Sequence, residues 1–170
     1  MIRAILPVLF LLMVSLVHAQ SIEELEKRNG FKGIQLGAVA DSVKGSKMKK
    51  EFKEKDVYPA KLYSVEHTDY EKIGEVKVKD IEMKAYKDLI YEITVTTEKD
   101  PRLMKALESL YGKADYDMKN QLYFWKSDRI MLRFKATGKH ELILEYTSPV
   151  VRNMMKEDKE KKVNDIANDF

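Results

Sequence analysis

The sequence contains no cysteine, and this absence removes several kinds of site at once. Without cysteine there is no disulfide to cross-link the fold, no thiolate nucleophile and no lipobox to carry a lipid anchor. The fold must therefore be held together by its apolar core, and the chain is long enough to form one.

The signatures of common enzymes are also missing. The sequence has no G-x-S-x-G, phosphate-loop, dinucleotide-binding or H-E-x-x-H motif, and only His67 and His140 follow the first 19 residues. His67 lies near Ser64 and Asp69, but residues so close together in a strand point to alternate faces and cannot form a catalytic relay. We therefore expect no catalytic residues and a protein that is not an enzyme.

Metal-binding and nucleic-acid-binding patterns are absent as well. Asp115 and Asp117 form a D-x-D pair, but no third carboxylate, glycine or distal glutamate completes a calcium-binding loop. Basic and acidic side chains number 31 and 28 and are interspersed, which argues against a dedicated nucleic-acid-binding protein. We expect no metal and no cofactor.

The one long apolar run lies at the N-terminus, from Ala4 to Val17, and follows Arg3. Val17 and Ala19 suit the −3 and −1 positions of a signal-peptide cleavage site, so residues 1–19 are predicted to be removed after Ala19. The run is shorter than the roughly 20 residues of a membrane helix, and no later run approaches this length. We expect a periplasmic or extracellular protein with no transmembrane segment in the mature chain, whose remaining length suits one domain.

The strongest helix signals lie between Asp100 and Gly112. Asp100 is a suitable N-cap, Pro101 suits the first helical position, and Gly112 suits a left-handed C-terminal cap. Four apolar side chains share one face and are expected to be buried against a sheet: Leu103, Leu107, Leu110 and Tyr111.

Alternating apolar and polar residues predict three strands on each side of this helix. A phase slip at Lys79-Asp80 indicates a β-bulge or tight turn, and Lys87-Asp88 suits a hairpin turn. Strand 89–96 has apolar residues on both faces and is expected to be central in its sheet. The six predicted strands are 60–65, 76–85, 89–96, 122–126, 129–136 and 141–147.

A helical segment is predicted between Asp41 and Lys55, from a capping pattern and the i,i+4 pair Met48 and Phe52. Each half of the chain then consists of a helical segment followed by three strands. We predict a single α+β domain over residues 20–148, built from tandem α-β-β-β units (31–97 and 100–148) with an antiparallel sheet covered by helices. A weak helix precedes it between Ser21 and Gly30, and a C-terminal helix occupies 149–170.

Lysines are concentrated between residues 44 and 56, and four of them are candidates for contact with an anionic surface such as lipid headgroups: Lys47, Lys49, Lys50 and Lys53. The alternative is an ordinary solvated helix face. The sequence favours this alternative, because acidic residues interrupt the lysines and no aromatic residues are interleaved.

Aromatic residues cluster in the second half of the chain. On strand 122–126, Tyr123 and Trp125 share one face and Phe124 lies on the other. An exposed Tyr-Trp pair, together with Tyr116, would be a candidate anchor for a protein partner. Core packing under the C-terminal helix is the favoured alternative.

Four short motifs resemble a recurring, uncharacterised type of exported bacterial domain: Phe31-x-Gly33-Ile34-x-Leu36-Gly37, Ile73-Gly74, Leu110-Tyr111-Gly112-Lys113 and Tyr123-Phe124-Trp125. At fold level the tandem order is similar to the β-lactamase-inhibitor-like architecture shared with small outer-membrane assembly proteins. That resemblance implies a non-enzymatic role in binding another envelope or secreted protein. The lipobox cysteine of the lipid-anchored assembly proteins is absent here. The alternative function is that of a carrier for a small apolar ligand or lipid, held between sheet and helices.

Overall fold

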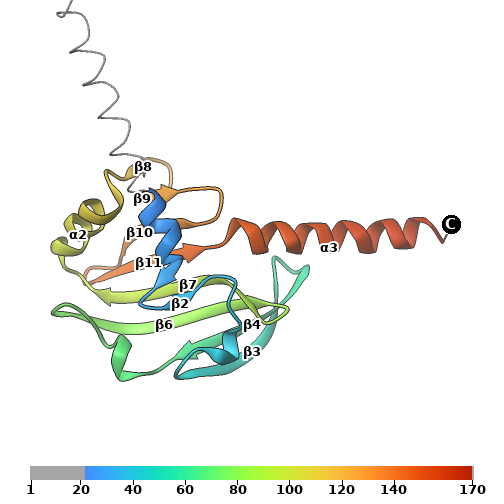
Figure 1. The fold of residues 1–170 in the computed structure, drawn as a ribbon, viewed down its shortest axis with the longest axis horizontal. Coiled ribbons are helices and arrows are strands. Elements are labelled where there is room, and N and C mark those ends of the chain that lie inside the picture. Colours follow the sequence, from blue (N-terminus) through green and yellow to red (C-terminus); the bar gives the residue numbers. More distant parts are fainter. Residues whose placement is uncertain (1–21, 170) are drawn as a thin grey trace, which may run out of the picture.

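The computed structural model describes residues 22–169 and is organised around one large antiparallel sheet (Figure 1). Within these residues the sheet has nine strands, of which eight follow the order β3-β4-β6-β7-β11-β10-β9-β8 and β5 pairs with β6. The strands of this sheet are β3 (Ser46–Glu54), β4 (Tyr58–Val65), β5 (Lys72–Ile73), β6 (Val76–Tyr86), β7 (Leu89–Glu98), β8 (Asp115–Asp117), β9 (Leu122–Lys126), β10 (Met131–Thr137) and β11 (Glu141–Thr147).

Helices cover both faces of the sheet. Residues 22–28 are helical, and α2 is Pro101–Tyr111; both pack against the large core on one face. The first turns of α3 (Pro149–Ala167) pack on the opposite face. The remaining elements are a short hairpin, β1 (Gly30–Phe31) and β2 (Ile34–Gln35), and two 3-10 turns, η1 (Ala40–Ser42) and η2 (Thr68–Tyr70). The α+β class, the antiparallel sheet covered by helices and the C-terminal helix are therefore confirmed.

The central hairpin follows the sequence prediction closely. β7 lies between β6 and β11 in the middle of the sheet, as its two apolar faces indicated. The pairing of β6 with β7 shifts register between Val78 and Asp80, which is the β-bulge that the phase slip predicted. Lys87 and Asp88 both have positive φ, as a tight two-residue hairpin turn requires.

The predicted helix between residues 41 and 55 is wrong, because most of this segment forms β3. β3 pairs with β4 from Ser46 to Glu54 and ends in a turn where Lys55 and Asp56 have positive φ. The i,i+4 spacing of Met48 and Phe52 is compatible with one face of a regular strand as well as with one face of a helix, so it did not identify the element. In the structure a register shift between Met48 and Lys50 pairs Met48 with Tyr63 and Phe52 with Ala60, so the two side chains lie on opposite faces of β3. Each predicted half therefore contributes four strands to the long path of the sheet rather than three, with β3 added to the first and β8 to the second. Residues 31–97 contain 3-10 turns but no α-helix, so this half does not have the predicted α-β-β-β order.

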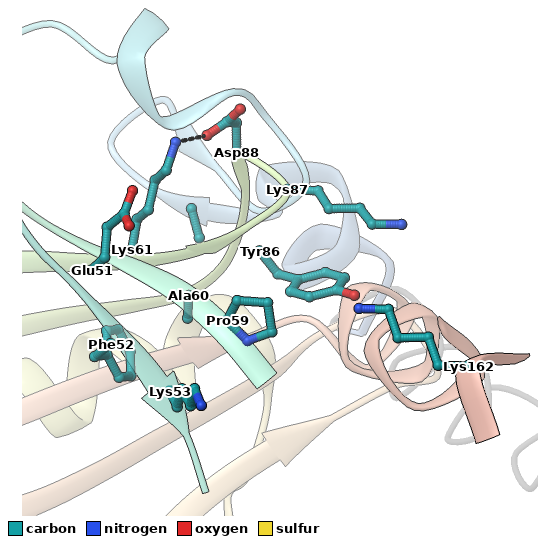
Figure 2. Close-up of a pocket in the computed structure, with 11 residues that line it drawn as sticks. Glu51, Phe52, Lys53, Pro59, Ala60, Lys61, Tyr86, Lys87, Asp88 and Lys162 are labelled. Carbon is teal, nitrogen blue, oxygen red and sulfur yellow. Dashed lines mark hydrogen bonds and ion pairs between the residues drawn. The ribbon is translucent and has the colours of Figure 1, made fainter. Parts of the chain in front are cut away.

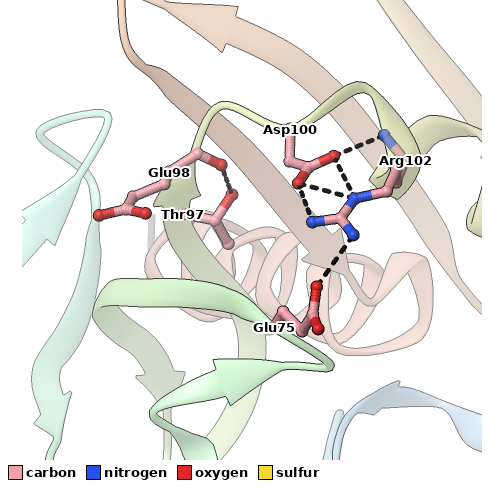
Figure 3. Close-up of polar contacts among 5 residues, drawn as sticks. All are labelled: Glu75, Thr97, Glu98, Asp100 and Arg102. Carbon is pink, nitrogen blue, oxygen red and sulfur yellow. Dashed lines mark hydrogen bonds and ion pairs between the residues drawn. The ribbon is translucent and has the colours of Figure 1, made fainter.

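Helix α2 begins and ends where the sequence predicted. The Asp100 side chain accepts a hydrogen bond from the Arg102 backbone N–H at 2.8 Å, and the Arg102 guanidinium bridges Asp100 and Glu75 (Figure 3). These hydrogen bonds hold the pKa of Asp100 below its usual value. Gly112 ends the helix at φ 79°. Leu110, expected to be buried, is instead 41% exposed, because it lies at the margin of the apolar face.

Helix α3 contacts the body only through its first half. Ser148 caps it by accepting a hydrogen bond from the Val151 N–H, and Val151 and Met155 are buried against the sheet. Asp158 contacts Tyr86 and Lys87 of the β6–β7 hairpin, and beyond this point the helix extends past the sheet (Figure 1). Val163 and Ile166 are more than half exposed, so the apolar side chains of this helix are buried only near its beginning.

Among residues 22–169, no helix has both the length and the apolar character needed to cross a membrane. The predicted signal peptide and the cap at Ser21 lie outside the described residues.

Candidate functional site

The aromatic strand β9 places its side chains on opposite faces, with Trp125 in the core. Trp125 is 2% exposed, and its indole N–H donates to the Gly112 carbonyl at 2.8 Å. Tyr111 packs edge-on against the indole, with ring centroids 6.2 Å apart. The interpretation of this face as core therefore holds at Trp125, but the covering element is the end of α2 rather than the C-terminal helix. Trp125 is not available as a partner anchor.

Tyr123 lies on the same face as Trp125, two residues earlier in β9, but is much more exposed. It pairs directly with Tyr116 of β8, and the two rings are 4.8 Å apart between centroids. The two tyrosines are 41% and 50% exposed, and Met118 in the following turn is 83% exposed. These three exposed residues, here called the β8 patch, lie on the edge strand β8, on its neighbour β9 and in the turn after β8.

The turn that carries the β8 patch is ordered by Asp117. Its carboxylate accepts hydrogen bonds from the backbone N–H groups of Lys119 and Asn120 and from the Asn120 side-chain amide, at 2.7–3.1 Å. Side-chain and backbone hydrogen bonds from Asn120 lower the pKa of Asp117. The second carboxylate of the D-x-D pair, that of Asp117, therefore caps a turn. In the part of the chain that the structure describes, no group of three or more acidic or histidine side chains is arranged to hold a metal.

The four candidate lysines lie on the edge strand β3 and not on a helix. Lys47 pairs with Glu66 at 3.3 Å, and Lys49 pairs with Glu82 at 3.1 Å, an interaction that raises the pKa of Lys49. These ion pairs balance part of the local positive charge. The structure thus brings the four lysines to one strand without making a single convergent basic site.

His67 and Asp69 are closer than the sequence predicted. His67 caps the 3-10 turn η2, and its Nδ1 accepts a hydrogen bond from the Asp69 backbone N–H at 3.2 Å. The Asp69 carboxylate, 3.4 Å from that nitrogen, is also paired with Lys44 at 3.1 Å. The turn brings the two side chains together, whereas an extended strand would separate them. His67 therefore serves to cap the turn, and the Asp69 carboxylate is engaged in an ion pair with Lys44.

A cavity of about 320 Å³ lies between the helical residues 22–28, α2 and the sheet. Its lining is mainly apolar, and basic side chains lie at its margin. Burial raises the pKa of Tyr146, one of the lining side chains, well above its usual value. The residues that define it are Phe31, Ile73, Leu103, Leu107, Leu144 and Tyr146, with Lys27, Arg28 and Lys32 as the basic members.

A buried ionic network fixes α3 to the sheet, and sequence reasoning missed it entirely. Glu92 of β7 is 6% exposed and pairs with Lys84 at 2.8 Å and with Arg152 of α3. The Tyr91 hydroxyl donates to Glu54 at 3.0 Å, and the Arg152 guanidinium lies over the Tyr91 ring. These residues are distant in the sequence, so no local motif could have revealed them.

Comparisons with protein-family models, with curated proteins and with solved structures give no match.

Proposed function

We propose that this chain is an exported, non-enzymatic binding protein of the bacterial envelope, and that it contacts another envelope or secreted protein through the β8 patch. The observation that carries the proposal is the exposed pair of Tyr116 and Tyr123, whose rings are tilted against each other with centroids 4.8 Å apart, followed by the exposed Met118 in the next turn. Export is supported by the sequence of residues 1–19, which has the three regions of a signal peptide.

The chemistry of the β8 patch suits a protein partner. Tyrosine and methionine are enriched at protein interfaces, since each offers a large apolar surface and tyrosine adds a hydroxyl group. The contact between the two tyrosine rings and the turn ordered by Asp117 hold the patch in place before binding. Less conformational entropy is then lost when a partner packs against it.

A site-specific photo-crosslinker tests the proposal in the native cell envelope. Placed at Met118, it should give one discrete crosslinked partner, and the double substitution Tyr116→Ala and Tyr123→Ala should abolish that product. The same crosslinker at Lys139, an exposed position in the turn between β10 and β11, is the matched control. Equal crosslinking from both positions, or a product that survives loss of both tyrosines, would refute the assignment of the patch.

The second candidate function is that of a carrier for a small apolar ligand or lipid. The cavity between residues 22–28, α2 and the sheet favours it, because an apolar lining with basic side chains at the margin suits a fatty acid or similar molecule. Native mass spectrometry of protein recovered gently from the envelope distinguishes the two functions. A small added mass that disappears after organic extraction supports the carrier, and a protein-sized addition supports the partner.

A further inference from the structure

The cavity between residues 22–28, α2 and the sheet, here called the α2 cavity, is elongated along the helix. Leu103 in the first turn of α2 and Tyr111 at its end both line it. These residues are eight helical positions apart, a span of about 12 Å. On the sheet side, Leu144 and Tyr146 line the cavity from one face of β11. The α2 cavity is therefore long enough for an extended chain, and its two ends can be compared.

The end of the cavity at the last turn of α2 is polar. Tyr111 and Tyr146 are only 5% and 3% exposed, and neither hydroxyl makes a hydrogen bond within residues 22–169. Burial raises the pKa of both phenols, and the charge of the nearby Arg28 guanidinium opposes this rise. Both hydroxyls are therefore protonated donors without an acceptor in this part of the protein. Burial makes such donors favour an acceptor that enters the cavity.

Arg28 supplies positive charge at the same end. Its Nε donates to Glu24, one helical turn earlier, at 2.7 Å, and the guanidinium has further N–H donors for another acceptor. Lys27 also lines the cavity, and none of the described lining residues is acidic. This end therefore combines two buried hydroxyl donors with a guanidinium, which suits an anionic group.

The opposite end of the α2 cavity, at the first turn of the helix, is apolar. Ile73 and Leu103 line it, and the ion pair between Arg102 and Glu75 fixes the turn after β5 beside the helix (Figure 3). The ammonium group of Lys32, the basic residue here, donates to two backbone carbonyls, each at 2.7 Å. Two of its three N–H donors are thereby used. This end suits the apolar tail of a ligand better than an anionic head group.

The larger hollow beside the β3–β4 hairpin, of about 520 Å³, lacks this polarity. Lys61 pairs with Asp88 at 2.8 Å, and Glu51 lies opposite Lys61 in the pairing of β3 with β4 (Figure 2). The same register places Glu51 and Lys61 on the face of the hairpin opposite to Ala60. The charged side chains of this hollow are therefore paired or divided between two faces, and they do not form a single end that prefers an anion.

We infer that the α2 cavity binds an unbranched carboxylic acid, with the carboxylate held by Arg28, Tyr111 and Tyr146 and the apolar chain directed toward Ile73 and Leu103. This inference rests on the carrier function, the second candidate above, and specifies the head group and the direction of the ligand. A carboxylate can accept hydrogen bonds from both phenols and from the guanidinium together. The neutral hydroxyl of an alcohol has no charge to pair with the guanidinium.

Decanoate labelled with carbon-13 at its terminal methyl group tests the head group and the orientation. Titrated into isotope-labelled protein, it should cause saturable NMR shifts of the Leu107 and Leu144 amides, and decanol should bind at least about tenfold more weakly. In the complex, the terminal methyl group should give nuclear Overhauser contacts to Ile73 and Leu103. Contacts to Leu110 instead, seven residues farther along α2, would show the reverse orientation and overturn the inference.

Variants test the head-group contacts separately. Arg28→Gln and Tyr146→Phe should each weaken decanoate binding about three- to tenfold and leave the affinity for decanol nearly unchanged. The matched control is Tyr63→Phe, which removes the hydroxyl of another buried tyrosine in the same core but outside the cavity and should change neither affinity. Lys32→Gln should weaken decanoate binding less than Arg28→Gln does. A larger effect of Lys32→Gln would place the carboxylate at the opposite end and overturn the inference.

The two ligands also separate this inference from the carrier function. Equal affinities for decanoate and decanol would overturn the assigned head group and leave the carrier function standing. Binding of neither ligand would overturn both. Tyr116 and Tyr123 do not line the cavity, so their double substitution by alanine should not change decanoate binding, and the proposed partner contact can fail independently.

Discussion

Replacing Trp125 with alanine should be among the most destabilising single changes in the protein. The indole ring buries about 200 Å², which at about 25 cal/mol per Å² corresponds to about 5 kcal/mol before the loss of side-chain entropy. The cavity left by Trp125→Ala and the unpaired Gly112 carbonyl add to the cost of the lost contacts. We expect a loss of about 3 to 5 kcal/mol in the free energy of unfolding.

The assay is denaturant unfolding followed by far-UV circular dichroism, because Trp125 is the only tryptophan and its removal eliminates the fluorescence signal. Trp125→Phe should lower the free energy of unfolding by about 1 to 3 kcal/mol, mainly because the Gly112 carbonyl loses its hydrogen-bond donor. The control is Tyr123→Ala on the same strand and face. Since Tyr123 is 41% exposed, this change should cost about 1 to 2 kcal/mol. A loss below about 1 kcal/mol for Trp125→Ala, or equal losses for the two alanine variants, would refute the assignment of Trp125 to the core.

Three further predictions concern the backbone, the buried network and pH. Gly30→Ala should lower the free energy of unfolding by at least about 2 kcal/mol, because the added Cβ would lie 2.0 Å from the Ile34 backbone oxygen. Gly33→Ala, where φ is positive but the space around the Cβ is open, should lower it by about 1 to 2 kcal/mol. Equal thermal denaturation midpoints for the two variants would contradict this difference. Glu92→Ala removes the buried carboxylate shared by two cations and should lower the free energy of unfolding by about 3 to 5 kcal/mol; an unchanged denaturant midpoint would refute this. Hydrogen bonds from Lys87 and Tyr86 hold the pKa of Asp158 below its usual 3.8. The contribution of Asp158 to stability is therefore complete above pH 3.8. It is lost as the pH falls through the lower pKa of the folded state. The side-chain carboxyl carbon signal of Asp158 should therefore titrate below pH 3.8, and Lys87→Gln should move its midpoint upward; an unchanged midpoint would exclude this role.

The features that the sequence predicted correctly are those encoded by neighbouring residues. The β6 bulge, the Lys87-Asp88 turn and both ends of α2 follow from local alternation, turn chemistry and caps. β3 was mistaken for a helix because the spacing of its apolar residues is compatible with a helix and with a strand. Only the pairing of β3 with β4, which the local sequence does not contain, shows that it is a strand.

The candidate site was only partly predictable, for a similar reason. Sequence alternation correctly placed Tyr123 and Trp125 on one face, but their opposite exposure depends on how far Tyr111 at the end of α2 reaches across β9. The Glu92–Arg152 pair joins residues 60 positions apart. Such contacts arise from tertiary packing, which a local pattern does not contain.

The two outer edges of the sheet differ in a way that supports the proposed partner contact. In the strand order, β7 and β11 meet at the centre, so β3 and β8, the first strand that each half of the chain adds to the large sheet, become the edges. β3 presents four lysines over nine residues, and charged side chains of this kind discourage unintended strand pairing. β8 is only three residues long, which limits strand addition, yet it exposes Tyr116 and is followed by Met118. An edge that is too short to extend a sheet but retains large exposed apolar side chains is better suited to side-chain-mediated binding, and we therefore expect partner specificity to depend on the β8 patch and not on backbone pairing.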